Sequence, residues 1–463
     1  MKNKKILSYI DVINRDLNFN FVIKYLIEQN SNINFDVKHQ DIQNSFYKSS
    51  YFDEIQNNYD LLLTPSYNVR RMESTYSRAW HFKTNIVHTH SEPLSESVLF
   101  EEKLNLSNLS QYNEEVQYHI VWSDYFAELL VKVAKVSPEK IYKVNNIRYE
   151  IIDKMSRKNI IKDIDYLFIS DFSIADFTEE QFMVHKKTYN IPDWVDYRSL
   201  AIEARNKFVN IIDKAASENK DKKFVIRMHP GEKIDFYKKY EKENIEINFV
   251  GDISDLIIQS KIAFGYTSTT LFECIAANVM MYNIKLVEVP KFLDQEVYNY
   301  YNWIDESKVL KICKNPEKYI SKKYSDEIYN KYEYFVGKMR DNYASLKYCL
   351  ALEDILKNPN KKFLPFKFKV LKQDFLHILK DISLKLSCMI FDYMKLKTPI
   401  YKLAKNNKLA ELKEDDYLSV ENIQNKYFRF LNDMNINLGY DEKLDYKVIQ
   451  KKYCKEIYIN GEK

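Results

Sequence analysis

The stretch FVIRMHPGE, residues 224–232, decides how this sequence folds. Its apolar first half carries the β-branched and aromatic side chains that strands prefer. Pro230 and Gly231 then end the strand, so Arg227 and His229 are expected at its carboxyl end. Ligands of open α/β sheets bind at that edge. The stretch therefore predicts an α/β protein with a binding site that includes these four residues.

A second strand edge follows in FGYTSTTLFE, residues 264–273. A strand runs into the hydroxyl-rich turn of Ser268, Thr269 and Thr270, which opens a helix. Hydroxyls and free N–H groups at a helix start bind phosphate, as do the cationic and imidazole donors of the first edge. A turn that only caps its helix is the alternative. Glu273 is expected either to accept from a ribose hydroxyl or to complement the helix dipole.

The composition describes a globular protein of more than one domain. The chain has 463 residues, of which 45% are hydrophobic and 15% aromatic, and this length exceeds one ordinary core. A net charge of +4 is too small to predict a nucleic-acid partner. The five scattered cysteines show no metal-ligand spacing, which indicates reduced cytosolic thiols.

Strand and helix signals alternate along most of the chain, which predicts parallel sheets built from βαβ units. We expect a first Rossmann-like, acceptor-side domain over 1–156 and a second, nucleotide-sugar donor domain over 157–357. In the first, strands are expected at 6–12, 34–39, 60–64, 85–89 and 119–122, with helices at 17–29, 73–82 and 125–133. In the second, strands are expected at 166–170, 224–228, 245–250, 262–266 and 280–284, with helices at 198–217 and 343–356. Two doubly wound halves that face a cleft predict the GT-B architecture.

The third part, 358–463, has a different composition and is expected to be a helical basic extension. Residues 361–408 hold twelve lysines and three acidic residues, with apolar residues interleaved at helical spacing. Such a helix suits an anionic membrane surface, or it packs on the second domain with a solvated lysine face. The start of the chain shows no signal-peptide pattern, and no uncharged run reaches the ~20 residues of a membrane span. The expected location is cytoplasmic, with a peripheral place on the inner face of the membrane if the extension binds there.

The richest stretch of the first domain is HTHSEP, residues 88–93, at the end of the strand 85–89. A carboxylate or imidazole at a sheet edge suits removal of an acceptor hydroxyl's proton. Glu92 is our first choice for this base and His90 the second, with His88 beside them. A helix-capping loop with buried histidines is the alternative.

Other candidates lie at further strand ends and crossovers. Arg70 and Arg71 follow a strand and suit an anionic acceptor, and Ser170 ends the first strand of the second domain. Asn146 and Arg148 lie in the crossover between the domains. The DxD-like residues 163–165 precede a strand, so they indicate solvated charge, and neither a cofactor nor an essential metal is expected.

The order of these pieces resembles bacterial surface-carbohydrate and capsule transferases of GT-B type. That group includes Kdo and sialic-acid transferases with His-Pro and Ser/Thr motifs, and CDP-glycerol transferases. The matching pieces are HTHSEP (88–93), VNNIRYEII (144–152), YLFISDFS (166–173), RMHPGE (227–232) and GYTSTTLFECIAANV (265–279). VNNIRYEII departs from the group's GNPR-type crossover, with Asn145 in place of its glycine and Ile147 in place of its proline.

The resemblance implies that His229 binds the donor phosphate, assisted by Ser268 and Thr269, and it favours a cytidine-linked donor over a uridine-linked one. The expected function is transfer of a sugar from a nucleotide-activated, CMP-linked donor to a polysaccharide, lipooligosaccharide or glycolipid acceptor. One rival is a UDP-sugar 2-epimerase on the same fold, which usually shows a Ser-Gly-Gly turn at 268–270. The other is a non-catalytic glycan-binding or scaffold protein. A non-catalytic protein of this fold is expected to have lost some of its site residues. This sequence keeps all four of Arg227, His229, Ser268 and Glu92, which argues against that rival.

Overall fold

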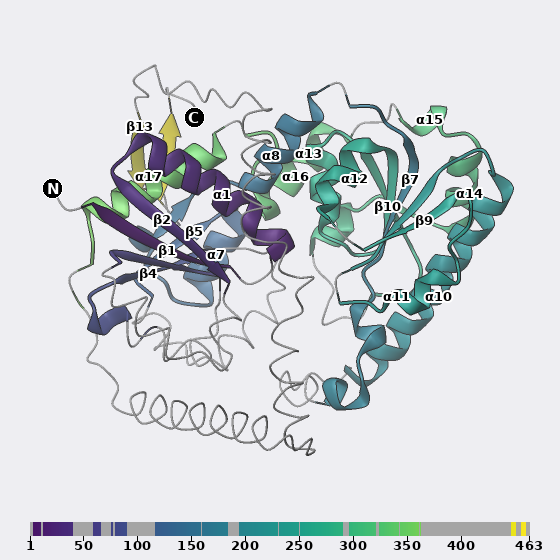
Figure 1. The fold of residues 1–463 in the computed structure, drawn as a ribbon, viewed down its shortest axis with the longest axis horizontal. Helices are drawn as coiled ribbons and strands as arrows, with labels where there is room; N and C mark the ends of the chain where they lie inside the picture. The colour runs from purple at the N-terminus through teal and green to yellow at the C-terminus, as the bar shows by residue number, and fades with distance from the viewer. Residues whose placement is uncertain are drawn as a thin grey trace, which may run out of the picture.

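The structure is a computed structural model of the chain. It describes residues 3–10, 13–39, 59–65, 76, 79–89, 116–158, 160–183, 194–229, 231–249, 251–289, 296–320, 324–341, 343–360, 362, 446–450 and 455–459. These residues form two α/β domains that lie side by side (Figure 1). The expectation of two doubly wound domains is confirmed.

The first sheet has eight strands, of which β1 to β6 run parallel to their neighbours. The strands follow one another across the sheet as β13 (Tyr446–Gln450), β14 (Lys455–Ile459), β6 (Ile141–Lys143), β5 (Tyr118–Val121), β4 (Asn85–Thr89), β3 (Leu61–Thr64), β1 (Lys4–Ile10) and β2 (Ile33–His39). β14 pairs parallel with β6, and β13 pairs antiparallel with β14.

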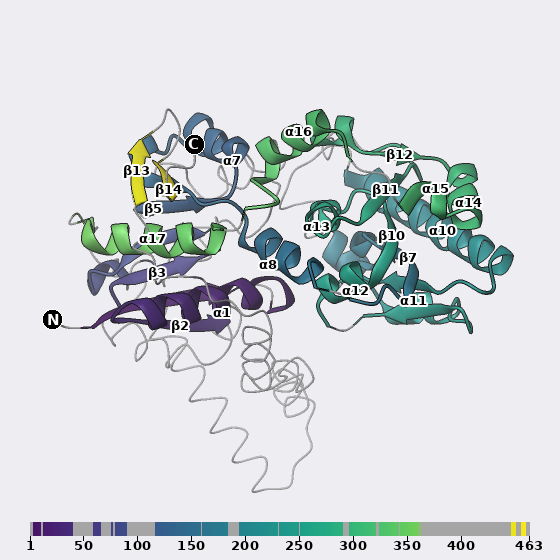
Figure 2. The ribbon, with the colours of Figure 1, turned by 90° about the horizontal axis from the view of Figure 1, so that it is seen from above.

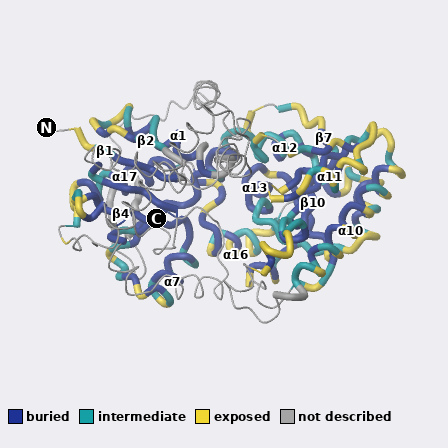
Figure 3. Tube along the Cα trace, turned by 60° about the horizontal axis from the view of Figure 1, so that its bottom comes forward, coloured by how far each residue is buried: buried dark blue, intermediate teal, exposed yellow. Residues whose placement is uncertain are grey.

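Helices cover both faces of the first sheet because its strands are apolar on both sides. Along β1, Ile6 joins the core beneath α1 (Ile13–Asn30), whereas Leu7 joins the core beneath α7 (Asp124–Lys132). A short 3-10 helix, η1 (Pro138–Lys140), precedes β6. The central strands are buried in both domains (Figure 3).

The second sheet has six strands, and all of its neighbours pair parallel. Across the sheet they are β12 (Trp303–Ile304), β11 (Met280–Ile284), β10 (Ser260–Gly265), β7 (Ile164–Ile169), β8 (Phe224–Arg227) and β9 (Ile245–Asn248). One core lies between the sheet and η2 (Ser173–Asp176), α10 (Trp194–Glu218), α11 (Ile234–Lys238), α14 (Glu306–Lys314) and α15 (Glu317–Ile320). The opposite core lies against α8 (Ile147–Ser156), α12 (Ile253–Gln259), α13 (Thr270–Ala276), η4 (Glu296–Tyr300) and α16 (Asp326–Val336).

The chain crosses between the domains twice. α8 follows β6 of the first sheet and leads to β7 of the second. After α16 the chain returns to the first domain, where α17 (Ala344–Lys357) lies beside α1 (Figure 2). The expectation that this last helix closes the second domain, 157–357, is therefore wrong, because its apolar face shares the core of α1 and β1.

The end of the chain also differs from the expectation of a wholly helical extension over 358–463. β13 and β14 add a hairpin to the β6 edge of the first sheet. Residues 363–445, with most of the basic stretch, lie outside the described residues. Among the residues that the structure describes, no helix is both long and apolar enough to cross a membrane.

Candidate functional site

His229 lies just beyond the carboxyl end of β8 and is exposed. Its Nδ1 accepts a hydrogen bond from the Gly231 N–H at 3.1 Å. A ring nitrogen that accepts carries no hydrogen, so the hydrogen of the neutral imidazole lies on Nε2. Nε2 makes no hydrogen bond to another described residue. The loop thus presents a fixed N–H donor at the sheet edge.

Glu232, a residue that the sequence analysis quoted but gave no role, holds this loop to β7. One carboxylate oxygen accepts from the Ser170 hydroxyl and the other from the Phe172 N–H. Ser170 Oγ in turn accepts the His229 N–H at 3.1 Å. Burial raises the pKa of Glu232, and these hydrogen bonds oppose that rise. Ser170 is itself buried, so it positions the histidine loop and is not open to a ligand.

Gly231 allows the loop to lie close to the segment after β7. A Cβ at this position would lie 3.0 Å from Ser173 Cβ and 3.3 Å from His229 Nδ1. Any larger residue would therefore push against the imidazole that the loop orients. Pro230, its neighbour in the motif, lies outside the described residues.

Arg227 is buried and directed away from His229, toward the neighbouring strand end. Its guanidinium donates to Asn248 Oδ1 at 2.5 Å and to the Gly251 carbonyl at 2.7 Å. Burial lowers its pKa, and Asp252 acts in the opposite direction. The described contacts give Arg227 a structural role, and direct binding of a donor by Arg227 stays a prediction.

The hydroxyl-rich turn is present after β10, but the first N–H groups of α13, those of Thr270, Leu271 and Phe272, are not free. Thr270 N donates to Ser268 Oγ at 3.3 Å, and Leu271 N and Phe272 N donate to the carbonyls of Ser268 and Thr269. This local capping corrects the expectation of open helix N–H donors. The Thr269 hydroxyl, which is half-buried, makes no hydrogen bond to another described residue. The Ser268 hydroxyl donates to Thr270 Oγ1 at 3.1 Å, so a ligand would meet the hydroxyls of Thr269 and Thr270 as donors and that of Ser268 only after it leaves Thr270.

The two predicted edges are not on neighbouring strands. β7 lies between β8 and β10, so the two loops start about 10 Å apart, two strand spacings. Both loops attach to the segment that follows β7. Glu232 contacts Ser170 and Phe172, while Thr267 Oγ1 donates to Asp171 Oδ2 at 2.9 Å. The site is thus a row of three strand ends, with β7 in the middle.

Glu273 is almost fully buried and forms an ion pair with Arg148 of α8. One oxygen of Glu273 takes the guanidinium, whereas Oε2 makes no hydrogen bond within the described part of the chain. Glu273 lies one helical turn after Thr269, so the two side chains share a face of α13. The crossover residue Arg148 thereby reaches the donor-side helix, a contact that sequence patterns do not reveal.

Phe249 is a further residue that the sequence analysis missed. It follows β9 at the same carboxyl edge and is 54% exposed, whereas the aromatic residues of the neighbouring strands are buried. β9 is the neighbour of β8, which leads to His229, and an exposed ring at this edge offers a stacking face for a planar group of a ligand. Its signal in the sequence was an aromatic residue at a strand end, two residues before Gly251.

In the first domain, His88 is fully buried in β4 and pairs in register with His119 of β5. Their rings lie 5.8 Å apart, edge to face. Burial lowers the pKa of His88 to about 3, and burial is also the largest cause that lowers the pKa of His119. His88 is therefore a neutral core histidine, and its expected place in an acceptor site is wrong. Arg70, Arg71, His90 and Glu92 lie outside the described residues.

The carboxyl edges of the two sheets meet near the start of α8. β6 leads directly into α8, whose Arg148 contacts the helix that follows β10. Trp122, just after β5, lies against Gly337 of the second crossover. No group of three or more potential metal ligands occurs among the residues that the structure describes.

Comparison with known proteins finds similarity in structure only. No protein-family model and no curated protein matches the sequence. A structure of the wall teichoic acid polymerase TagF aligns with a TM-score of 0.52 at 10% identity, over 78% of this chain and 90% of TagF. A TagF variant soaked with CDPG gives 0.51 at 12% identity, over 77% and 90% of the two chains. The S. aureus MnaA–UDP structure gives 0.48 at 12% identity, over 79% and 100%.

The chain has the GT-B fold. Identities this low show the fold alone, so activity is inferred from the site.

Proposed function

We propose that this protein is a glycosyltransferase of GT-B type that uses a nucleotide-activated sugar, with the nucleotide bound at the carboxyl edge of the second sheet. The observation that carries the proposal is the exposed His229, whose Nδ1 accepts the Gly231 N–H, which leaves Nε2 as the donor nitrogen of the neutral ring. A donor fixed in this way stabilises the negative charge that develops on a leaving phosphate. The TagF variant soaked with CDPG supports a cytidine nucleotide, and CMP is our first candidate for the leaving group.

The neighbouring groups suit the remaining parts of a nucleotide. The hydroxyls of Ser268, Thr269 and Thr270 follow the strand on the far side of β7, where they suit phosphate oxygens. Glu273 Oε2 suits a ribose hydroxyl.

The acceptor half of the reaction rests on the sequence. Glu92, with His90 as the second choice, is proposed to take the proton of a polysaccharide or lipooligosaccharide hydroxyl. The acceptor is then held on the first domain, and the domains bring donor and acceptor together.

A thermal-shift panel with CMP, CDP, UDP and GDP tests the donor half. We expect a cytidine nucleotide to raise the Tm of the wild type and to lose this effect in His229→Ala. His81→Ala, which removes an exposed histidine of the first domain, is the matched control and should keep the shift. Equal shifts in His229→Ala and the wild type would rule out the phosphate role of His229.

A second measurement separates transfer from epimerisation. The protein is incubated with UDP-N-acetylglucosamine in deuterated water, and the sugar C2 is followed by NMR. We expect no exchange at C2. Exchange that depends on the enzyme would replace the transferase proposal with a 2-epimerase.

A further inference from the structure

The start of α8 connects the donor-side helix to the rest of the molecule. Arg148 follows Asn146, whose side chain caps α8 by accepting the Arg148 N–H at 2.9 Å. The Arg148 side chain is 19% exposed and pairs with the 4% exposed side chain of Glu273. An inter-domain residue thus supplies the cation for a buried carboxylate of the donor domain.

Arg148 contacts only one of the two oxygens of the Glu273 carboxylate. The guanidinium binds Oε1, while the buried Oε2 makes no hydrogen bond to any described residue. A buried carboxylate oxygen without a donor is costly, and it is well suited to accept from a ligand hydroxyl. Thr269 lies one turn earlier on α13, so Glu273 and the hydroxyl-rich turn share one face of this helix.

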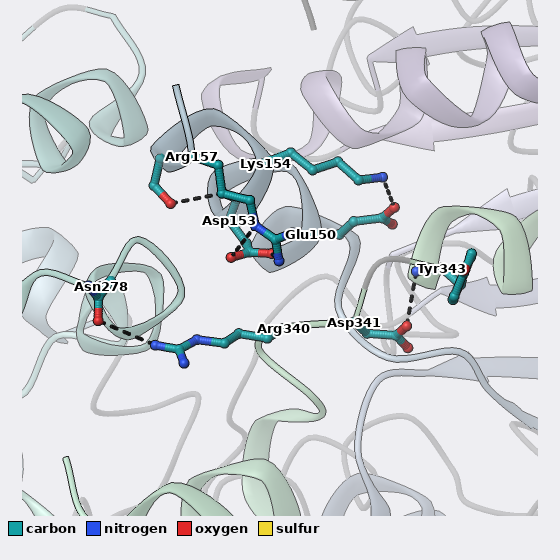
Figure 4. A network of polar contacts seen from close by, with 9 residues as sticks. Glu150, Asp153, Lys154, Arg157, Asn278, Arg340, Asp341 and Tyr343 are labelled. Carbon is teal, nitrogen blue, oxygen red and sulfur yellow. Dashed lines mark hydrogen bonds and ion pairs between the residues drawn. The ribbon is translucent and has the colours of Figure 1, made fainter. Parts of the chain in front are cut away.

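Other side chains of α8 form hydrogen bonds that fix this helix to the first domain. Glu150 of α8 accepts the Ser345 N–H of α17 at 2.7 Å and pairs with Lys154. Figure 4 shows the pair of Glu150 and Lys154 on α8 and, in the same view, Asp341 of the second crossover. Asp341 also accepts from Asn145 and Lys347, so the two crossovers are bonded to each other. The position of Arg148 therefore depends on contacts with the first domain.

We propose that Arg148 is a positioning residue of the nucleotide site, which acts through Glu273 to hold and charge-balance the carboxylate that accepts a donor hydroxyl. The inference rests on the proposed function, since it deepens the account of the same site. It predicts that a residue outside the donor domain sets nucleotide affinity. The consequence is that donor binding and the placement of the two domains are coupled through one ion pair.

The test is a double-mutant cycle read as the Kd for CMP by titration calorimetry. We expect Arg148→Ala to weaken CMP binding at least tenfold and Glu273→Gln to weaken it as well. Arg148→Ala/Glu273→Gln should bind no more weakly than Glu273→Gln alone, because Arg148 acts only through Glu273. A structural role of Arg148 would instead weaken binding by the same factor in both backgrounds, and this result, or no effect in either, would overturn the inference.

Two further variants keep the test decisive. Arg148→Lys retains the charge and should bind CMP more tightly than Arg148→Ala but more weakly than the wild type. If Arg148→Ala does not fold, the comparison of Arg148→Lys with the wild type still tests the role of Arg148. Arg157→Ala removes the arginine at the C-cap of α8, which pairs with Asp153 and not with Glu273, and should leave the Kd unchanged. If the wild type binds none of the four nucleotides of the thermal-shift panel, the proposed function fails. If the wild type binds CMP, and both Arg148→Lys and Arg148→Ala bind CMP as tightly as the wild type does, only this inference fails.

Discussion

At the scale of the residue, the site depends on groups that hold His229 as much as on His229 itself. The Glu232 carboxylate accepts hydrogen bonds from the Ser170 hydroxyl and the Phe172 N–H, and Ser170 Oγ accepts one from the His229 N–H. The sequence placed His229 at a strand end because Pro230 and Gly231 follow it. It did not reveal the Glu232 contacts, because they join residues 62 and 60 positions apart in the chain, a relation that periodicity does not encode.

Glu232→Gln should weaken this arrangement. The amide places an NH₂ group where one of the two N–H or O–H donors now finds an oxygen, so one buried donor loses its acceptor. We expect a loss of about 1–3 kcal/mol in the free energy of unfolding, together with weaker nucleotide binding. Urea denaturation and CMP titration measure the two effects. The exposed carboxylate of Glu246 provides the control, and an equal effect of Glu246→Gln would contradict this role of Glu232.

The buried His88 predicts a dependence of stability on acid. Its pKa is about 3 in the folded protein and about 6.5 in the unfolded chain, so between these values only the unfolded state takes up the proton. Stability should therefore fall as the pH drops below about 6.5, by up to about 1.4 kcal/mol per pH unit for this histidine. His88→Asn should reduce that slope in denaturation curves between pH 5 and pH 6.5. An unchanged slope would show that His88 is charged in the fold.

At the scale of the element, local patterns predicted most strands of both sheets, because their apolar runs end at glycine, proline or polar residues. The partner of α17 was not predictable, since an apolar helix face does not specify which core receives it. The hairpin of β13 and β14 was missed for a similar reason, because an edge pairing is a long-range contact. At the first crossover the sequence did carry a usable signal. Asn145 has φ 66°, the left-handed conformation that a glycine adopts most easily.

The end of α16 offers a prediction with an internal control. Gly337 has φ +83°, and a Cβ there would lie 2.2 Å from the Trp122 carbonyl oxygen. Gly251 has φ +81° with nothing within 4 Å of a Cβ. Gly251→Ala should cost about 1–2 kcal/mol from backbone strain alone, and Gly337→Ala should cost clearly more. Equal losses in urea denaturation would mean that the close approach of the second crossover to β5 is wrong.

At the scale of the whole molecule, the two domains share α8. Ile147 and Ile151 join the core of the first domain, whereas Tyr149 and Ile152 join a core of the second. A helix buried on both sides cannot unfold with one domain without exposing the core of the other. We therefore expect a single calorimetric unfolding transition. Two well-separated transitions would show that α8 does not link the cores.

The central claim is that His229 binds the phosphate of the donor nucleotide. The most direct test compares the Kd values of CMP and cytidine for the wild type and for His229→Ala. A hydrogen bond to a charged group contributes about 1.5–3 kcal/mol. We therefore expect the preference of the wild type for CMP over cytidine to fall by about tenfold or more in the variant, with the affinity for cytidine unchanged. An undiminished preference for CMP in His229→Ala would contradict the account.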